Sequence, residues 1–182
     1  MIYFRNLLYN IVKYVSKSGV SMNINTTYTK IITGEDLMET AQHGSTLYPF
    51  QFYYEDLSVF DFNCIEWHWH TELEFIYIES GTVTLWIGED QFHLTEGNGV
   101  FINTKVLHRL YSPSKALIPN FVFMPSFIAP CDSLIYQKYI LPIISSSLPF
   151  LVFHKKVCWQ AKVLSIMRQI ISAQDSVLSK EL

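Results

Sequence analysis

The sequence predicts a mainly β domain, a sandwich or small barrel of the jelly-roll type, that is followed by α-helices. Between Tyr48 and Met124, short runs of β-branched and aromatic residues follow one another, separated by Gly, Asn, Asp and Pro. This texture is typical of closely spaced strands. Gly88-Glu89-Asp90 lies between two such runs and indicates a tight hairpin. Beyond Pro125 the pattern becomes helical, so strands come first and helices last.

About eight short strands are expected in succession, which favours two packed sheets or a closed barrel. They cover residues 49–54, 62–70, 73–79, 82–87, 91–94, 99–103, 108–111 and 117–124. Outside this region the expected elements are a short helix over 35–43, a helix over 133–141 that ends at Pro142, a last strand over 149–153 and a longer helix over 157–173.

The N-terminal part of the chain is predicted to be a separate helical extension. Apolar residues recur about twice per turn up to residue 18, and a Ser- and Gly-containing linker follows. We therefore divide the chain into an extension (1–21), a β domain (22–155) and a helical segment (156–182). Met22 is an alternative start of the functional protein.

Composition excludes several classes of protein. Lys and Arg number 13 against 16 Asp and Glu, which gives a net charge of −3 and no basic excess for binding duplex DNA. Three cysteines without a Cys-x-x-Cys pair argue against a disulfide framework or a Cys-based zinc site, and favour a reducing, cytoplasmic location. No apolar run approaches the roughly 20 residues of a membrane span.

The residues that carry chemistry lie at 67–79 and near 108. On a β-strand, side chains of equal parity share a face, so His68, His70 and Glu74 are expected to point into one cavity. In a small barrel, His108 on a later strand can lie opposite them. Two imidazoles and a carboxylate are half of a divalent metal shell. The alternative is a hydrogen-bonded polar patch without metal, which would form the floor of a pocket for a polar ligand.

Other aromatic and histidine residues receive structural interpretations. Trp86 and Phe101 are candidate pocket walls on which a sugar ring would stack. The odd-numbered residues Trp67, Trp69, Phe75 and Tyr77 are expected to face away from the cavity. The remaining histidines are expected to be surface or structural residues; they are His43, His93 and His154.

Two sequence motifs carry a family resemblance. His-x-His-x3-Glu-x6-Gly, from His68 to Gly81, resembles the first signature motif of the cupin superfamily. The second motif, Gly-x5-Pro-x-Gly-x2-His-x3-Asn, is matched at Gly97 and His108. The chain departs from it at Asn103, Lys105 and Ser112, where Pro, Gly and Asn are expected. With the trailing helices, residues 35–173 resemble the ligand-sensing N-terminal domain of AraC-type transcription regulators.

The resemblance implies a cupin double-stranded β-helix that binds a small polar effector, such as a sugar, and is not an enzyme. It also implies a homodimer formed through the C-terminal helices. The predicted dimer residues are Val163, Leu164, Met167, Ile170 and Ile171. In that family a DNA-binding domain of about a hundred residues with two helix-turn-helix units follows. This sequence has no room for it, so the chain is either a fragment of a longer regulator or a stand-alone sensor.

The rival function is a metal-dependent cupin enzyme, an oxygenase or isomerase. The resemblance implies that enzymatic cupins hold iron, manganese, nickel or zinc at the positions of His68, His70, Glu74 and His108. Lys105 lies just before the last of these, and its positive charge would weaken metal binding unless its side chain points away.

Overall fold

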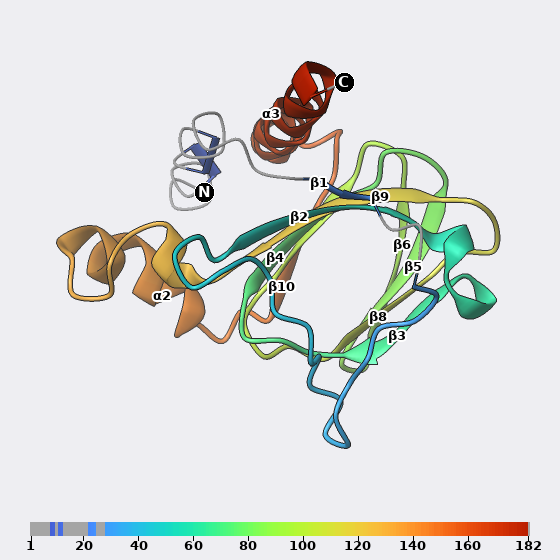
Figure 1. Ribbon diagram of the computed structural model, residues 1–182, viewed down its shortest axis with the longest axis horizontal. Coiled ribbons are helices and arrows are strands. Elements are labelled where there is room, and N and C mark those ends of the chain that lie inside the picture. The colour runs from blue at the N-terminus through green and yellow to red at the C-terminus, as the bar shows by residue number, and fades with distance from the viewer. Residues whose placement is uncertain (1–7, 10, 13–21, 25–27, 182) are drawn as a thin grey trace.

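The computed structural model describes residues 8–9, 11–12, 22–24 and 28–181 (Figure 1). Residues 8–9 and 11–12 are helical. The rest of the predicted extension over 1–21 lies outside the described residues.

Two sheets face each other and enclose the interior of the domain (Figure 1). The larger sheet has six strands in the order β1 (Met22–Ile24), β2 (Phe50–Asp56), β9 (Leu117–Phe123), β4 (Leu73–Tyr77), β7 (Gly99–Ile102) and β10 (Phe150–Phe153). The smaller has four in the order β3 (Cys64–His68), β8 (His108–Tyr111), β5 (Thr82–Ile87) and β6 (Asp90–Thr95). Neighbouring strands pair antiparallel, except for β1 and β2, which pair in parallel. The mainly β prediction is confirmed.

The predicted strands form at the expected places. β5 and β8 have the predicted bounds, and β3 begins at Cys64 because residues 61–63 form a 3₁₀ turn, η2 (Asp61–Asn63). A second such turn, η1 (Leu57–Val59), precedes it. The predicted hairpin joins Ile87 to its pairing partner Asp90, and Gly88 adopts a φ of +57° there.

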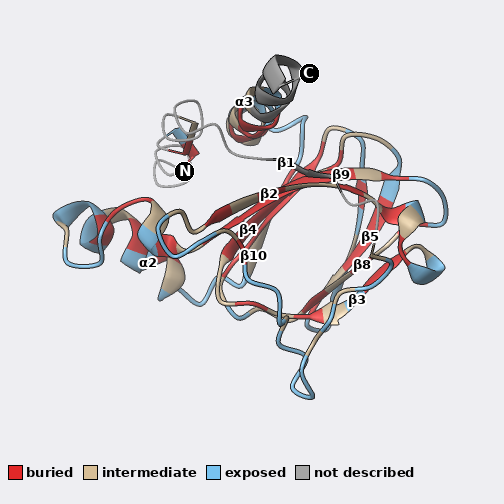
Figure 2. Ribbon diagram, viewed as in Figure 1, coloured by how far each residue is buried: buried red, intermediate tan, exposed pale blue. Residues whose placement is uncertain are grey.

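The hydrophobic core has two parts, one on each face of the larger sheet. The outer cluster packs aromatic residues of this sheet, such as Phe52 and Phe121, against α3 (Cys158–Glu181) and the N-terminal Leu8 and Ile11. The inner cluster lies between the two sheets and is mostly aliphatic. Both faces of the larger sheet are therefore buried (Figure 2).

The expected helix over residues 35–43 does not form, and that prediction is wrong. Leu37 has a φ of 66°, and Thr33 and Glu39 form an antiparallel bridge around a turn. The Glu39 amide donates to the Trp69 carbonyl at 2.9 Å, and the Trp69 amide donates to the Leu37 carbonyl at 3.1 Å. Pairing with the end of β3 thus supplies the backbone hydrogen bonds that a helix would have made internally.

The C-terminal helices differ from the prediction at their ends. A short 3₁₀ turn, η3 (Pro125–Phe127), comes first. The π-helical turn η4 (Tyr136–Ile140) follows and continues directly into α2 (Leu141–Ile144). Pro142 therefore does not end the helix; it lies in the first turn of α2, where a missing amide hydrogen costs little. α3 extends past residue 173 to Glu181, since no Gly or Pro interrupts that stretch.

Candidate functional site

Four polar side chains meet at one end of the space between the sheets. His68 at the end of β3 pairs directly with His108 at the start of β8, and their ring centroids lie 4.1 Å apart. The register shifts between Ile65 and His68, and the His68 side chain lines the cavity between the sheets. One ring nitrogen from each of His68, His70 and His108 lies within 4.8 Å of the others. The predicted convergence of these residues is therefore present.

Glu74 on β4 completes the group from the opposite sheet. Its Oε2 atom lies 3.3 Å from Nε2 of His70 and 3.2 Å from Nε2 of His108. Burial by itself would raise the pKa of the Glu74 carboxyl. The hydrogen bonds and positive charge of His108 and His70 outweigh burial and lower that pKa below its usual value. Glu74 is thus an ionised carboxylate in a buried site.

Hydrogen bonds to backbone carbonyls determine the tautomer of two of the three imidazoles, those of His68 and His108. Nδ1 of His68 lies 2.8 Å from the Glu66 carbonyl oxygen, and Nδ1 of His108 lies 2.9 Å from that of Val106. A carbonyl only accepts, so Nδ1 carries the hydrogen and Nε2 faces the group. Burial and the neighbouring His108 lower the pKa of His68, which favours its neutral form.

This donor set fits a divalent metal ion. Metal-binding histidines commonly donate their other N–H to a backbone carbonyl, as His68 and His108 do. Nε2 of His108 is buried and lies 3.2 Å from Oε2 of Glu74. Either a proton on this nitrogen or a cation between the two groups would satisfy both. Three imidazole nitrogens and one carboxylate are ligands that suit iron, manganese, nickel or zinc.

The three departures from the second motif have structural explanations. Lys105 adopts a φ of 60°, a conformation that the expected glycine takes without strain, and its side chain is exposed. Asn103 is buried and donates to the carbonyls of Ile143 and Leu148, both at 3.0 Å, which ties β7 to the helical segment. Ser112 donates to the Thr82 carbonyl at 2.8 Å. None of the three side chains lies among the side chains of His68, His70, Glu74 and His108.

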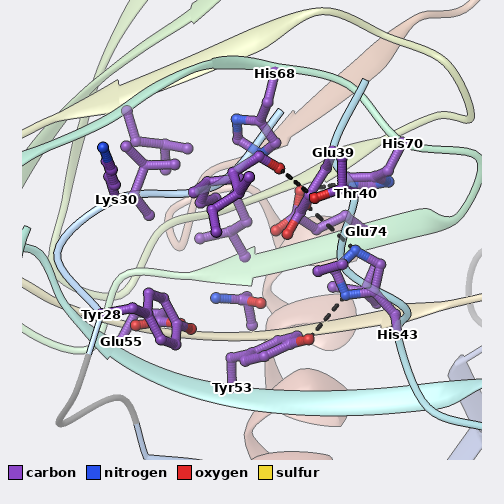
Figure 3. A pocket seen from close by; sticks show the side chains of 18 of the residues that line it. Tyr28, Lys30, Glu39, Thr40, His43, Tyr53, Glu55, His68, His70 and Glu74 are labelled. Carbon is purple, nitrogen blue, oxygen red and sulfur yellow. Dashed lines mark hydrogen bonds and ion pairs between the residues drawn. The ribbon is translucent and has the colours of Figure 1, made fainter. Parts of the chain in front are cut away.

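A cavity of about 400 Å³ opens beside this group. Its walls come from both sheets and from the segment 28–43 (Figure 3). Apolar wall residues include Ile65, Ile76, Leu110, Ile118 and Val122. Figure 3 shows Tyr28 and Glu55 together on the side of the cavity away from His70 and Glu74. The cavity therefore has polar groups on two sides, and apolar side chains contribute to the rest of its lining.

His43 belongs to this cavity, so assigning it merely to the surface or to structure missed its place in the site. It is buried, its Nδ1 lies 2.8 Å from the Tyr53 hydroxyl, and its Nε2 lies 3.3 Å from Oε2 of Glu39. Its ring also contacts His70 at a centroid distance of 5.5 Å. Burial lowers the pKa of His43, but the hydrogen bond and charge of Glu39 outweigh it and raise the pKa. His93 and His154 are exposed, as expected.

Trp86 and Phe101 do not line the cavity, contrary to expectation. On β5 the inward residues are Val83, Leu85 and Ile87, so Trp86 faces outward, where the Arg109 guanidinium stacks 5.0 Å from its ring centroid. Phe101 is fully buried in the outer core cluster, 5.0 Å from the Phe75 ring. The sequence did not determine which alternate residues of each strand face the cavity. In the structure, Trp86 and Phe101 are on the faces that point away from it.

The predicted dimer residues are part of this chain's own core. They are at most 5% exposed, and they pack with the outer face of the larger sheet. These residues are Val163, Leu164, Met167, Ile170 and Ile171. They cannot also form the expected intermolecular seam, because β4, β7, β10 and the N-terminal residues already cover them.

The sequence interpretation missed further cavity residues, and five polar ones among them bear on the site. They are Tyr28, Glu39, Tyr53, Glu55 and Asn120. A signal existed in β2, where Phe50, Phe52 and Tyr54 alternate with Gln51, Tyr53 and Glu55. Polar alternate residues usually indicate a solvent-facing side. Here that side faces the cavity, since the helices cover the apolar side.

Comparison with known proteins supports the architecture. Residues 64–118 match the family model of the cupin domain. This stretch runs from β3 to the start of β9 and contains all four clustered residues. The fold is a cupin-type β-sandwich with C-terminal helices.

Among curated proteins, the chain is similar to YdeC, an uncharacterized HTH-type transcriptional regulator of Bacillus subtilis. The two are 24% identical over 143 residues, which are 76% of this chain and 48% of YdeC. The chain thus spans about half the length of this relative. Within the part of the chain that the structure describes, no helix has the length and hydrophobicity of a membrane span.

Similar solved structures include two cupins. An RmlC-like cupin from Shewanella frigidimarina is 17% identical, with 42% of this chain and 67% of that chain covered and a TM-score of 0.38. Oxalate decarboxylase of Bacillus subtilis, a protein with Mn(II) centres, is 21% identical, with 34% and 18% covered and a TM-score of 0.31.

Proposed function

We propose that this chain is the ligand-sensing part of an AraC-type transcription regulator, and that it binds a small polar effector inside the cupin barrel. The observation that carries this proposal is the cavity of about 400 Å³ with polar groups on two sides. The similarity to an HTH-type regulator supports a regulatory role. In this proposal residues 22–155 bind the effector in a cytoplasmic protein, and 156–182 connect to the rest of the regulator.

The cavity offers a direct way to sense a ligand. The segment 28–43 supplies one wall, and the strands supply the others, so a bound effector touches both. His43 already joins this segment to β2 through its hydrogen bond with Tyr53. An effector that binds better when the segment is closed shifts the population towards the closed arrangement. DNA binding would come from a domain outside this chain, and a homodimer would use a surface other than the buried stripe on α3.

Metal-dependent catalysis, as an oxygenase or isomerase, is the second candidate. The fixed imidazole tautomers and the ionised Glu74 favour it. His68, His70, Glu74 and His108 would hold the ion. When bound, the metal would act as a Lewis acid that polarises an oxygen of the ligand. The protein would contribute the orientation of the rings through the carbonyls of Glu66 and Val106 and exclusion of water by the apolar walls.

Two measurements on the purified chain separate these functions. Protein prepared without chelator is analysed for metals, and its thermal unfolding is followed with a panel of monosaccharides, polyols, amines and amino acids. A sensor is expected to show a panel compound that raises the Tm, without turnover of that compound. About one equivalent of iron or manganese together with turnover would favour the enzyme instead.

The matched variants are His70→Ala and His154→Ala. His70 lines the cavity, whereas His154 is exposed and is not one of the lining residues. The first variant is expected to abolish the ligand-dependent rise in Tm and the second to preserve it. A panel in which no compound binds would overturn the sensor proposal.

A further inference from the structure

We propose that the effector of this cavity is a small primary amine with an apolar body, and that Glu55 and Asn120 bind its ammonium group. The proposal rests on the function proposed above, because it concerns the same cavity. It specifies the chemical class of ligand and the residues that select it.

Hydrogen-bond acceptors dominate the lining of the cavity. Three carboxylates line it, those of Glu39, Glu55 and Glu74. Lys30 is the single Lys or Arg among the described lining residues, and it is exposed. Glu39 and Glu74 lie next to imidazoles, the first beside His43 and the second beside His70 and His108. The charge of Glu55 at the other side of the cavity disfavours an anionic ligand beside it and favours a cationic one.

Asn120 supplies an independent observation. It is 6% exposed and lines the cavity. Its Nδ2 atom donates to the Ile118 carbonyl at 3.3 Å, which fixes the orientation of the amide and leaves Oδ1 as the acceptor. No donor in the described part of the chain reaches that oxygen. The Asn120 side chain lines the cavity, so a ligand N–H can donate to this oxygen.

Glu55 and Asn120 are close enough to share one group. Glu55 pairs with Ile118 across β2 and β9, and Asn120 lies two residues further along β9 on the same face. Such diagonal neighbours are about 7–8 Å apart at the backbone, and their side chains approach more closely. Tyr53 pairs directly with Asn120, and its hydroxyl lies 2.8 Å from Nδ1 of His43. The Tyr28 hydroxyl donates to Oε1 of Glu55 at 2.6 Å and orients the carboxylate.

An ammonium group matches this arrangement because it has three donors and no acceptor. The Glu55 carboxylate and Asn120 Oδ1 would accept two of its hydrogens. A neutral hydroxyl group on the ligand would lack the ionic attraction, and a carboxylate would meet acceptors.

The rest of the cavity determines the body of the ligand. The lining also contains the aliphatic side chains of Ile65, Ile76, Leu110, Ile118 and Val122. An apolar body removes this surface from water, at about 25 cal/mol per Å². The volume of about 400 Å³ suits a ligand at the small end of the usual range.

The experiment compares probes that differ only in their head group. The first set is 2-phenylethylamine, 2-phenylethanol and phenylacetate, and the second is n-butylamine, n-butanol and butyrate. Kd values are measured by calorimetry at pH 7 on the whole chain, with EDTA present. Within at least one set, the amine is expected to bind about tenfold or more tightly than the alcohol, as for a hydrogen-bonded charge, and the carboxylate is expected not to bind.

Glu55→Gln keeps the shape of the side chain and an acceptor for Tyr28 but removes the charge. It is expected to bring the affinity for the amine down to that for the alcohol and to leave the alcohol unchanged. The control is Glu89→Gln in the exposed β5–β6 hairpin, where no change is expected. Comparing two probes on one variant cancels any general loss of stability.

Equal or tighter binding of the alcohol or carboxylate would overturn the amine assignment, as would an unaltered preference in Glu55→Gln. Binding of a monosaccharide but of no amine would also overturn it, while leaving the proposed function intact. If no compound of any class binds, the proposed function itself fails.

Discussion

The lowered pKa of His68 makes the stability of the protein depend on pH. Burial and the nearby His108 lower its pKa in the folded state below the unfolded value of 6.5. The folded protein therefore binds fewer protons than the unfolded chain once the pH falls below that value. Above about pH 6.5, His68 is neutral in both states and does not reduce the unfolding free energy. As the pH falls below this value, the unfolding free energy decreases, because only the unfolded chain takes up the proton.

His68→Gln is expected to flatten the pH dependence of stability between pH 7.5 and 5.5. The wild type should lose up to about 1.4 kcal/mol of unfolding free energy per pH unit more than the variant. Urea unfolding in the presence of EDTA measures this difference. His154→Gln, at an exposed position, serves as the control and should retain the wild-type slope. Identical slopes for wild type and His68→Gln would contradict the assigned shift.

Glu74 has the opposite role, because it is buried as an anion. Its folded pKa is lowered by His108 and His70 against the effect of burial. Its stabilising contribution is therefore present above the unfolded value of 4.5 and is lost as the pH falls below it.

Glu74→Gln is expected to reduce the unfolding free energy at pH 7 by about 3 kcal/mol, since it leaves buried imidazoles without their anionic partner. Denaturant unfolding of metal-free protein measures the loss. Glu89→Gln, which is exposed on a hairpin, should change stability by less than about 0.5 kcal/mol. If Glu74→Gln lost no more stability than Glu89→Gln, the Glu74 carboxylate would not stabilise the histidine group.

At the scale of elements, the strands could be predicted and the cavity walls could not. The positions of β5 and β8 followed from runs of β-branched and aromatic residues between turn residues, which are local features. The inward or outward direction of Trp86 and Phe101 depends on strand parity relative to a partner sheet, which no local pattern fixes. The same holds for β2, whose polar face is buried against the cavity.

The segment 28–43 shows a second limit of local patterns. Residues 35–43 have a helix-compatible composition, but they pair with Trp69 at the end of β3. Once this segment lies across the barrel, His43 becomes a cavity residue. Only a long-range contact places it there. The four motif residues were predictable because three of them lie within seven positions of one another in the chain, on β3, on β4 and on the connection between these strands.

The packing of α3 on β7 requires a glycine. A Cβ atom at Gly99 would lie 2.9 Å from the Ile76 carbonyl oxygen and 3.0 Å from Cδ2 of Leu164. Gly99→Ala is therefore expected to lower the unfolding free energy by about 1–3 kcal/mol through overpacking. The measurement is denaturant unfolding.

Gly34→Ala is the matched control for this prediction. A Cβ there would contact the end of the Asp36 side chain at 3.0 Å, which can move away. Its effect should be below about 0.5 kcal/mol. If Gly99→Ala is as stable as Gly34→Ala, then α3 does not pack closely on β7.

At the scale of the whole molecule, the N-terminal residues and α3 share one hydrophobic cluster. Leu8 and Ile11 are fully buried in the outer cluster, together with Met167 and Ile170. A chain that began at Met22 would lack these two residues and would expose part of the surface that they cover.

Leu8→Ala is expected to lower the unfolding free energy by about 2–5 kcal/mol, as for other large-to-small core substitutions. Tyr9→Ala, at a position that is 67% exposed, should have little effect. Thermal and denaturant unfolding of both variants test this. Equal stability of the two would mean that the N-terminal residues do not contribute to the core.

The two faces of β2 and β9 have a consequence for how such proteins diversify. The residues that pack against the helices, such as Phe52 and Phe121, and the residues that line the cavity, such as Glu55 and Asn120, lie on opposite sides of the same strands. Substitutions on the inner side would alter recognition while the aromatic scaffold stays intact. After gene duplication, copies of this domain would acquire new chemical preferences through a few changes at these inner positions, with little risk of unfolding.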